Sequence, residues 1–208
     1  VTGVQTCALP IFAQAEESAV PEADRLKRDV YTLASPEFEG RGTVEGKRKA
    51  REHLVAAFRE LRLRPLFPDE SYLQEIPGPK QLGGQETVMG INVGAVLPGS
   101  DPQLQDEYVI LSAHFDHLGI RGGKTYHGAD DNASSVAMML EVARLLAAQP
   151  VAPRRSVVFL SCDLEESLLW GSRWFVAHPP WPLERVKLFV TSELIGRTLG
   201  DQIGRAHV

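Results

Sequence analysis

The sequence predicts an α/β protein whose central sheet is covered by helices on both faces. Three short runs, at 108–111, 156–160 and 186–190, are mostly apolar and do not alternate with polar residues, which is typical of strands buried on both sides. They alternate with segments in which apolar residues recur at helical spacing, the clearest being 132–148. Buried strands that alternate with amphipathic helices are the pattern of an α/β domain.

The other elements follow from the same periodicities and from the turn residues between them. Apolar residues on one face predict a helix over 21–34, which ends at Ser35 because the residue before a proline avoids the helical region. Thr43 is expected to cap a second helix that runs to about Leu61. The remaining expected elements are strands at 72–76 and 87–97, a loop at 119–128 and a short helix at 171–177.

The composition excludes several classes of protein. Of the 208 residues, 43% are hydrophobic and 24% are charged, which suits a globular chain with a core rather than a disordered one. No apolar run approaches the roughly 18 residues that a membrane-spanning helix needs. The formal net charge of −5 argues against nucleic acid as a partner, because binding phosphates usually takes a basic face. The two cysteines cannot form a disulfide scaffold.

The two ends of the chain are expected to be foreign to the natural protein. Residues 1–11 and 203–208 can be read from opposite strands of one DNA word, as ligated sequencing adapters would be. We therefore leave them out of the fold reasoning and expect 22–202 to be part of one domain, cut at both sides. Residues 12–21 contain an Ala-Gln-Ala of the form that a signal peptidase cuts, so export to the periplasm or the medium and a plain linker both fit this stretch.

Polar side chains follow the three apolar runs at the point where each run ends. His114 and Asp116 follow the first run, Glu165 and Glu166 the second, and Glu193 the third. In an open α/β sheet, ligands bind beyond the carboxyl ends of the strands. Carboxylates and imidazole suit zinc, manganese or cobalt, and carboxylates gathered in one place repel each other unless cations compensate them. We expect a metal site at this edge of the sheet.

The acidic pair Asp130-Asp131 lies just ahead of the helix predicted at 132–148. Alone, such a pair more often forms a turn and a helix cap; together with the clusters at the strand ends it favours metal binding. Two metal ions that share a bridging carboxylate would balance the negative charge and activate a water for hydrolysis.

The motifs that contain these residues resemble those of the di-zinc aminopeptidase family of metallopeptidases, which includes secreted bacterial leucyl aminopeptidases and glutamate carboxypeptidase. The resemblance rests on His114-x-Asp116, on Gly-Ala-Asp-Asp-Asn-Ala-Ser at 128–134 and on Glu165-Glu166 with Gly171-Ser172 behind it, and it covers about 22–202. It implies a three-layer α/β/α fold of the zinc exopeptidase type with a mixed, mostly parallel sheet, incomplete at the C-terminus. It also implies two zinc ions as cofactors and a peptide as substrate.

The resemblance implies a role for each site residue. Glu165 would be the general base. The other implied roles are His114 and Glu193 as ligands of one zinc, Glu166 as a ligand of the other, Asp130 as the bridge between the two, Asp116 behind His114, and Asp131 next to the bridge across a cis peptide bond.

One ligand of the family's set has no counterpart in the natural part of this chain. It is a histidine far downstream, on the zinc held by Glu166, so we expect that zinc to be one ligand short. Whether the chain as given is active is therefore left open. We interpret His117 and His127 as loop residues and Cys162 as an apolar filler.

We expect a zinc-dependent exopeptidase, most simply an aminopeptidase that removes N-terminal residues by way of a metal-bridging water. Two alternatives stay open, a glutaminyl cyclase-like acyltransferase with one zinc and a non-catalytic binding module of the same fold. Metal content separates the three, at two ions, one or none. Substrate preference and oligomeric state stay open as well.

Overall fold

The structure is a computed structural model that describes residues 20–79 and 87–197. The adapter-like ends, the candidate export signal and the last residues of the expected domain lie outside these ranges. Within them, no helix combines the length and the apolar character needed to cross a bilayer.

The described elements alternate along the chain as the sequence predicts. The helices are α1 (Ala23–Leu33), α2 (Val44–Glu60), α3 (Ser134–Ala147) and α4 (Trp170–Ala177), with short turns of other helix types at η2 (Pro36–Arg41), η3 (Ala129–Ala133) and η4 (Leu183–Arg185). The strands are β1 (Arg64–Pro65), β2 (Leu73–Pro77), β3 (Val88–Leu97), β4 (Tyr108–Ser112), β5 (Gly119–Arg121), β6 (Lys124–Tyr126), β7 (Ser156–Ser161) and β8 (Val186–Thr191).

The central sheet is mixed, with strand order β1-β3-β7-β4-β8 and β2 also paired to β3. β4 runs parallel to both β7 and β8, whereas β3 is antiparallel to β1, β2 and β7. Antiparallel pairings therefore outnumber parallel ones in this sheet, whereas the sequence analysis expects a mostly parallel sheet. The parallel half consists of the three strands that the sequence predicts as buried on both sides. β7 is buried along its whole length, whereas β8 lies at the edge of the described sheet and is largely exposed, so the expected burial does not hold for β8.

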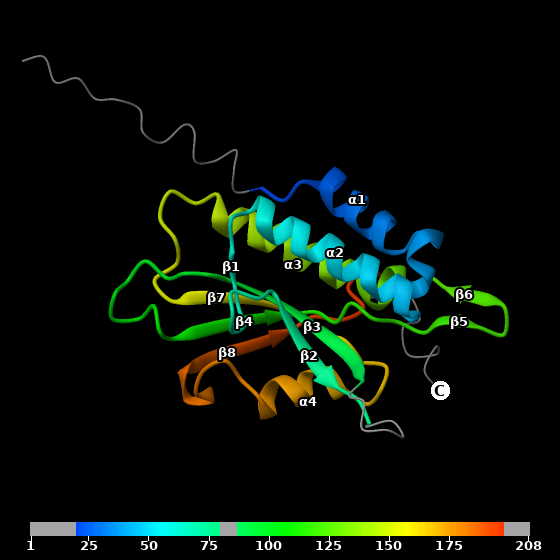
Figure 1. Ribbon diagram of the computed structural model, residues 1–208. Coiled ribbons are helices and arrows are strands. Elements are labelled where there is room, and N and C mark those ends of the chain that lie inside the picture. Colours follow the sequence, from blue (N-terminus) through cyan, green and yellow to red (C-terminus); the bar gives the residue numbers. More distant parts are fainter. Residues whose placement is uncertain (1–19, 80–86, 198–208) are drawn as a thin grey trace, which may run out of the picture.

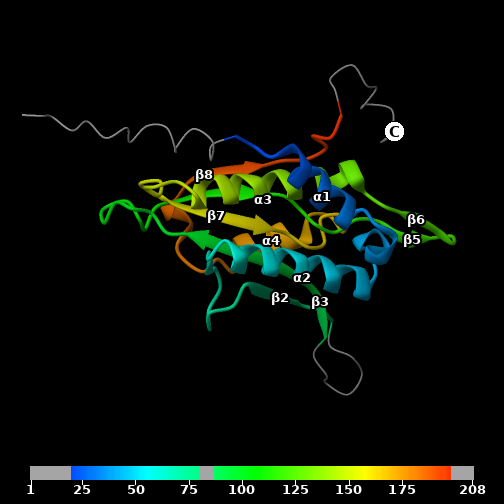
Figure 2. The ribbon, with the colours of Figure 1, turned by 90° about the horizontal axis from the view of Figure 1, so that it is seen from above.

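Helices cover the two faces of the sheet, which gives the expected three layers (Figure 1). α1, α2 and α3 lie over one face and α4 over the other, and the view from above shows α2 beside α3 along the sheet (Figure 2). The larger core packs under the three helices and includes Leu54, Phe58, Met139 and Phe159, each of them fully buried. A smaller cluster around Phe175 packs under α4.

Two local features connect the sequence to the elements near the site. Thr43 caps α2 as expected, since its Oγ1 accepts a hydrogen bond from the Gly46 N–H at 3.0 Å. The segment 119–128, expected to be a plain loop, contains the hairpin β5–β6. Gly122 and Gly123 at its tip have φ of 57° and 75°, which a two-residue hairpin turn requires and glycine adopts without cost.

Candidate metal centre

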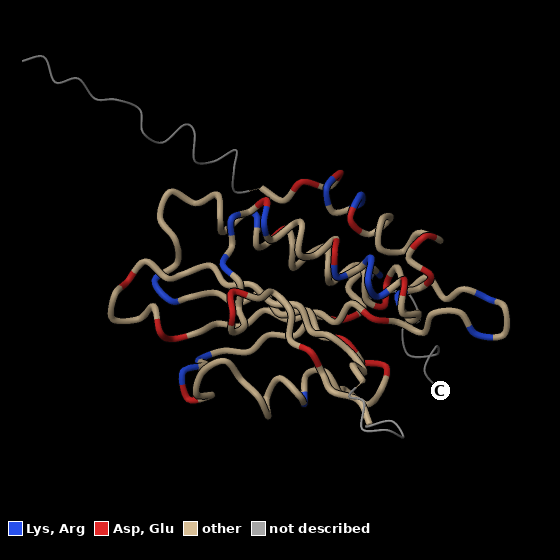
Figure 3. Tube along the Cα trace, viewed as in Figure 1, with Lys and Arg blue, Asp and Glu red and all other residues tan. Residues whose placement is uncertain are grey.

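The candidate site lies at the carboxyl ends of β4, β7 and β8. Because these strands are parallel neighbours, the residues that follow them meet at one edge of the sheet. Figure 3 shows acidic positions gathered at this end of the sheet, beside the β5–β6 hairpin. The structure divides the candidate metal ligands here into two groups of three, whose ligand atoms lie within 4.8 Å of one another in each group.

The first group consists of His114, Glu165 and Glu193. His114 is 5% exposed, and its Nδ1 lies 3.1 Å from the Asp116 carbonyl oxygen, which can only accept. Nδ1 therefore donates, and the lone pair of Nε2 faces the site. Nε2 is 3.9 Å from Glu165 Oε2 and 3.3 Å from Asp131 Oδ1. His114, Glu165 and Glu193 follow three different strands in the sequence, and the structure brings them together.

The second group consists of His117, Asp131 and Glu166. His117 Nδ1 lies 2.7 Å from Glu166 Oε1 and 3.8 Å from Asp131 Oδ2. Since its other oxygen faces His114, Asp131 lies between the two histidines with one carboxylate oxygen toward each. The structure thus places this carboxylate where an ion in either group could reach it.

The expected bridge, Asp130, is not in either group. Its Oδ1 accepts a hydrogen bond from the Gly196 N–H at 2.8 Å, and its Oδ2 lies 2.6 Å from Arg197 Nε. Asp131 has extended dihedrals (φ −108°, ψ 93°), so its side chain leaves the turn on the side opposite to that of Asp130. The cis peptide bond joins Asp131 to Asn132, not Asp130 to Asp131. The structure therefore brings Asp131, and not Asp130, between the two histidines.

Asp116 connects the histidine to the acidic segment. Its Oδ1 accepts a hydrogen bond from the Glu165 N–H at 3.0 Å and its Oδ2 one from the Glu166 N–H at 3.3 Å. It is 2% exposed and lies behind His114, as the sequence analysis expected. One buried carboxylate thus fixes the backbone of the two adjacent glutamates, which diverge toward different groups.

Arg41 is a fully buried cation that connects the loops of the site. It lies in η2, and its guanidinium donates hydrogen bonds to five backbone carbonyls, those of Leu33, Phe115, His127, Gly128 and Asp131, at 2.5 to 3.4 Å. Burial lowers its pKa to about 10, which the charges of Asp116 and Asp131 oppose. The segment after β4 and the segment before α3 are thereby fixed to one side chain.

An ion pair between Lys47 and the buried Asp163 anchors the segment of the acidic residues. Lys47 of α2 lies 2.6 Å from Asp163 Oδ1, and Asp163 also accepts hydrogen bonds from the N–H groups of Ile91 and Leu164. Beyond it the chain turns sharply toward α4. Leu164, Leu168 and Leu169 have φ of 58°, 61° and 60°, a left-handed conformation that leucine rarely adopts.

The charges of the site favour a bound cation. Burial raises the pKa of Glu165, and the carboxylates of Glu166, Glu193 and Asp116 raise it further against the opposing charge of His114. Burial lowers the pKa of His114, but hydrogen bonds to Asp116 and Asp131 outweigh it and raise the pKa to about 10. The carboxylates around His114 thus favour a positive charge at this position.

The geometry fits zinc. Ligand atoms about 2.0–2.1 Å from a tetrahedral zinc are about 3.3 Å apart, which is the distance between His114 Nε2 and Asp131 Oδ1. Imidazole and carboxylate are the ligand types that zinc takes in catalytic sites. The donor set of this site is therefore one that suits zinc.

A cavity of about 190 Å³ opens beside the first group. Its wall includes His114, Glu165 and Glu193 as well as the apolar Leu169 and Phe189. Cys162, also in the wall, is 4% exposed, and burial raises the pKa of its thiol to about 12, which makes it the inert filler that the sequence analysis expected.

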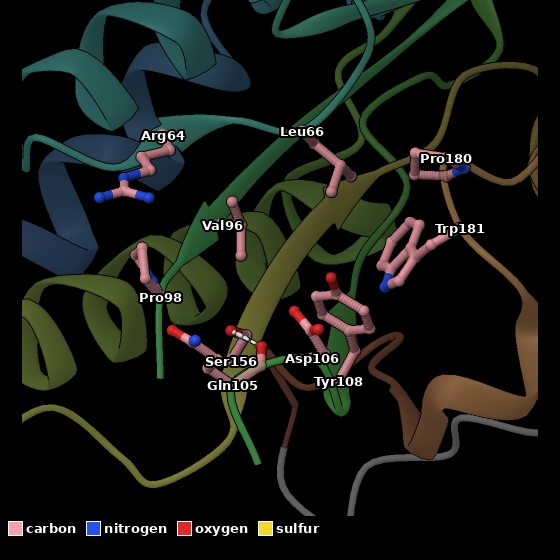
Figure 4. Close-up of a pocket in the computed structure, with 10 residues that line it drawn as sticks. All are labelled: Arg64, Leu66, Val96, Pro98, Gln105, Asp106, Tyr108, Ser156, Pro180 and Trp181. Atoms are coloured by element: carbon pink, nitrogen blue, oxygen red, sulfur yellow. Dashed lines mark hydrogen bonds between the residues drawn. The ribbon is translucent and has the colours of Figure 1, made fainter. Parts of the chain in front are cut away.

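A second cavity, of about 250 Å³, lies at the opposite end of the sheet (Figure 4). Tyr108 and Ser156, which begin β4 and β7, line it. Trp181 packs edge-on against Tyr108 with ring centroids 4.4 Å apart. Among the described residues that line this cavity there is no histidine, and Asp106 is the one acidic residue, so these residues do not offer the donor set of the site.

Sequence reasoning missed His117 as a site residue. The signal that could have found it is its position three residues after His114, on the short segment that leaves β4 toward the hairpin. The sequence analysis did not single out Arg41, and its function as a buried connection could not be read from the sequence.

Comparisons with known proteins agree with this geometry. The family model described as Peptidase family M28 matches residues 92–202, more than half of the chain. Endoplasmic reticulum metallopeptidase 1 of Rattus norvegicus is 35% identical over 106 residues, which are 50% of this chain and 11% of that protein. The chain therefore spans about a tenth of the length of this curated relative.

Solved structures show the same fold. Glutaminyl cyclase of Porphyromonas gingivalis superposes with a TM-score of 0.61 at 22% identity. The aligned region covers 86% of this chain and 62% of the cyclase chain. A Zn-dependent exopeptidase of Parabacteroides distasonis gives 0.62 at 17% identity and covers 85% and 63%.

Proposed function

The chain belongs to peptidase family M28, and from this premise we propose that it is the metal-binding part of a zinc-dependent aminopeptidase, which hydrolyses the first residue from peptides. The observation that carries the proposal is the position of Asp131, with one carboxylate oxygen toward each of two histidine-containing groups. A carboxylate shared in this way is what a two-metal hydrolytic site requires.

The proposed zinc ligands are drawn from the two groups, with Asp131 shared between the ions and Glu165 left free of metal. His114, Asp131 and Glu193 would hold one ion, and Asp131 with Glu166 would hold the other. Zinc at these positions would activate a water, and its positive charge would stabilise the negative charge that develops on the oxygen of the scissile carbonyl. Asp116 orients His114 and the two glutamates, and Asp130 stays outside.

Glu165 is the proposed general base. It lies within the first group but next to the cavity, with its backbone N–H held by Asp116. Its raised pKa suits a group that takes a proton from water and then gives it to the leaving amine.

The test compares Glu165→Gln with the parent chain for zinc content and for hydrolysis of aminoacyl p-nitroanilides. We expect zinc content to stay at the parent value and turnover to fall about 100-fold or more, the range for loss of a general base. Glu184→Gln, the same change at an exposed residue of η4, is the control and should leave both unchanged. Equal turnover in Glu165→Gln and the parent would reject the base.

The substrate class is tested with three compounds. An aminopeptidase cleaves peptides with a free amino terminus and leaves their N-acetylated forms intact. Cleavage from the carboxyl end would instead make the chain a carboxypeptidase, and cyclisation of glutaminyl peptides with a single bound zinc would make it a cyclase.

A further inference from the structure

We propose that Asn92 is a positioning residue, whose buried amide joins the two ends of the loop that carries Glu165 and so fixes the proposed base in place. The loop spans 163–171, from the end of β7 into the first turn of α4. The inference rests on the proposed function, because it concerns the same base. It assigns a role to a residue that lies outside both groups of candidate ligands.

Asn92 holds the first end of this loop, at the point where the pairing of β3 with β7 stops. The last pair of residues in the two strands is Val93 with Ser161. Beyond it, Asn92 Oδ1 accepts a hydrogen bond from the Asp163 N–H at 3.0 Å, and Asp163 Oδ2 accepts one from the Ile91 N–H at 3.0 Å. The two side chains thus continue the ladder between the strands by one step, and they fix the point at which the loop leaves the sheet.

The same amide holds the other end of the loop. Asn92 Nδ2 donates a hydrogen bond to the Gly171 carbonyl oxygen at 2.9 Å. Gly171 also packs directly on the first end, since a Cβ there would collide with the Asp163 carbonyl oxygen. Asn92 is 0% exposed, so both hydrogen bonds are shielded from solvent. One side chain therefore closes the neck of the loop, which consists of Asp163 and Gly171.

A short, braced stretch connects Glu165 to this neck. The Leu169 N–H donates to the Glu165 carbonyl oxygen at 2.9 Å. The Trp170 N–H donates to the Leu164 carbonyl oxygen at 3.0 Å, so the two sides of the loop are joined to each other. The N–H of Glu165 is held by Asp116 at 3.0 Å. The base is therefore fixed from two directions, by Asp116 on the side of the metal groups and by the neck on the side of β3.

The effect of Asn92 on the reaction has to pass through the loop, because Asn92 is buried and is not in the wall of the cavity beside the first group. A misplacement of about 1 Å in a catalytic group can lower the rate about 100-fold. A loop that is open at its neck would allow such a displacement of Glu165. Asn92 thus contributes to turnover without touching the reacting atoms.

The competing explanation is that Asn92 only stabilises the fold. Gln74 separates the two explanations, because its amide belongs to the same network but lies outside the neck. Gln74 Oε1 accepts a hydrogen bond from Asn92 Nδ2 at 3.0 Å, and its Nε2 donates to the His178 carbonyl oxygen at 2.8 Å. Loss of the Gln74 amide should therefore lower stability and leave the loop closed.

The experiment compares Asn92→Ser and the control Gln74→Leu with the parent for hydrolysis of aminoacyl p-nitroanilides. Saturating zinc is used, so that a weaker ligand at Glu166 does not enter the rate. Serine is too short to reach both ends of the loop, so we expect kcat to fall about 30-fold while KM stays within about twofold. In Gln74→Leu we expect both constants within about twofold of the parent, although urea should unfold both variants earlier than the parent.

Gly171→Ala opens the neck from its other end while Asn92 stays in place, and it decides the question if Asn92→Ser does not fold. The added methyl collides with the Asp163 carbonyl oxygen, and we expect a similar fall in kcat. Hydrogen exchange read by mass spectrometry adds a measurement that does not depend on activity. The amides of 163–171 should exchange about 10-fold faster in both neck variants, and at the parent rate in Gln74→Leu.

The outcomes separate this inference from the proposed function. Parent turnover in a folded Asn92→Ser or Gly171→Ala, or an equal fall in Gln74→Leu, would overturn the positioning role and leave the metallopeptidase proposal intact. Unchanged exchange in both neck variants would show that Asn92 does not close the loop. A parent that binds zinc and cleaves no peptide would instead reject the proposed function itself. Circular dichroism of each variant establishes that it is folded.

Discussion

The two groups of the metal centre are built on different foundations. His114 and Glu193 of the first group follow β4 and β8 directly, so the sheet itself sets their positions. His117 and Asp131 of the second group lie on connecting segments, where backbone hydrogen bonds to Arg41 take the place of strand pairing. The comparison teaches that the sheet sets the first group, whereas two of the three residues of the second group depend on one buried side chain.

The largest effect is expected from Arg41→Met, which removes the connection itself. Five carbonyls would lose their donor, and each buried polar group left unpaired costs about 1–3 kcal/mol. We expect the free energy of unfolding to fall by about 3 kcal/mol or more in urea titrations, and the second zinc to be lost before the first.

Arg48→Met is the control for Arg41→Met. Arg48 is exposed on α2 and pairs with Glu45 of the same helix, so its removal should cost less than about 1 kcal/mol. Equal losses in the two variants would show that Arg41 is not a structural connection.

A smaller effect, specific to metal binding, is expected from Asp131→Asn, because both groups share this carboxylate. We expect zinc affinity to fall about 100-fold at both positions, measured by competition with a chromogenic chelator. Asp130→Asn, the same change one residue earlier, should leave both affinities within about threefold, since Asp130 pairs with Arg197 outside the groups. The reverse result would restore the bridge that the sequence analysis expected.

The smallest of the three effects is expected from Gly128→Ala, which should affect the two groups to different extents. The added methyl would collide with the carbonyl oxygen of Asp131 and press on the ring of His117, which belongs to the second group. We expect the second ion to bind about 10-fold more weakly and the first ion, whose group shares Asp131 but not His117, to be weakened less. Gly122→Ala is the control, because its φ of 57° is equally unfavourable for alanine but a Cβ there meets nothing within 4 Å.

Much of the fold and half of the centre could be predicted from the sequence. Runs of mostly apolar residues indicate the strands in the sequence, and the ends of these runs give the positions of His114, Glu165, Glu166 and Glu193. The choice between Asp130 and Asp131 could not be predicted in the same way, because it depends on the dihedral angles of a turn and not on any periodicity.

His117 and the β5–β6 hairpin were missed for related reasons. The direction of the chain after β4 depends on Arg41, which is 76 residues before His117, and no local pattern reports so distant a contact. The hairpin is only three residues long on each side, too short to show alternation, although its two glycines were a usable signal.

The left-handed leucines near Glu165 affect which substitutions this sequence can accept during evolution. Leu168 is 83% exposed, so its side chain contributes little to packing, while its backbone conformation costs about 1 kcal/mol relative to an unstrained residue. Glycine there would relax the turn and make the folded chain more heat-tolerant. It would also loosen the stretch that presents the base, so selection for heat tolerance and selection for turnover would act on this residue in opposite directions.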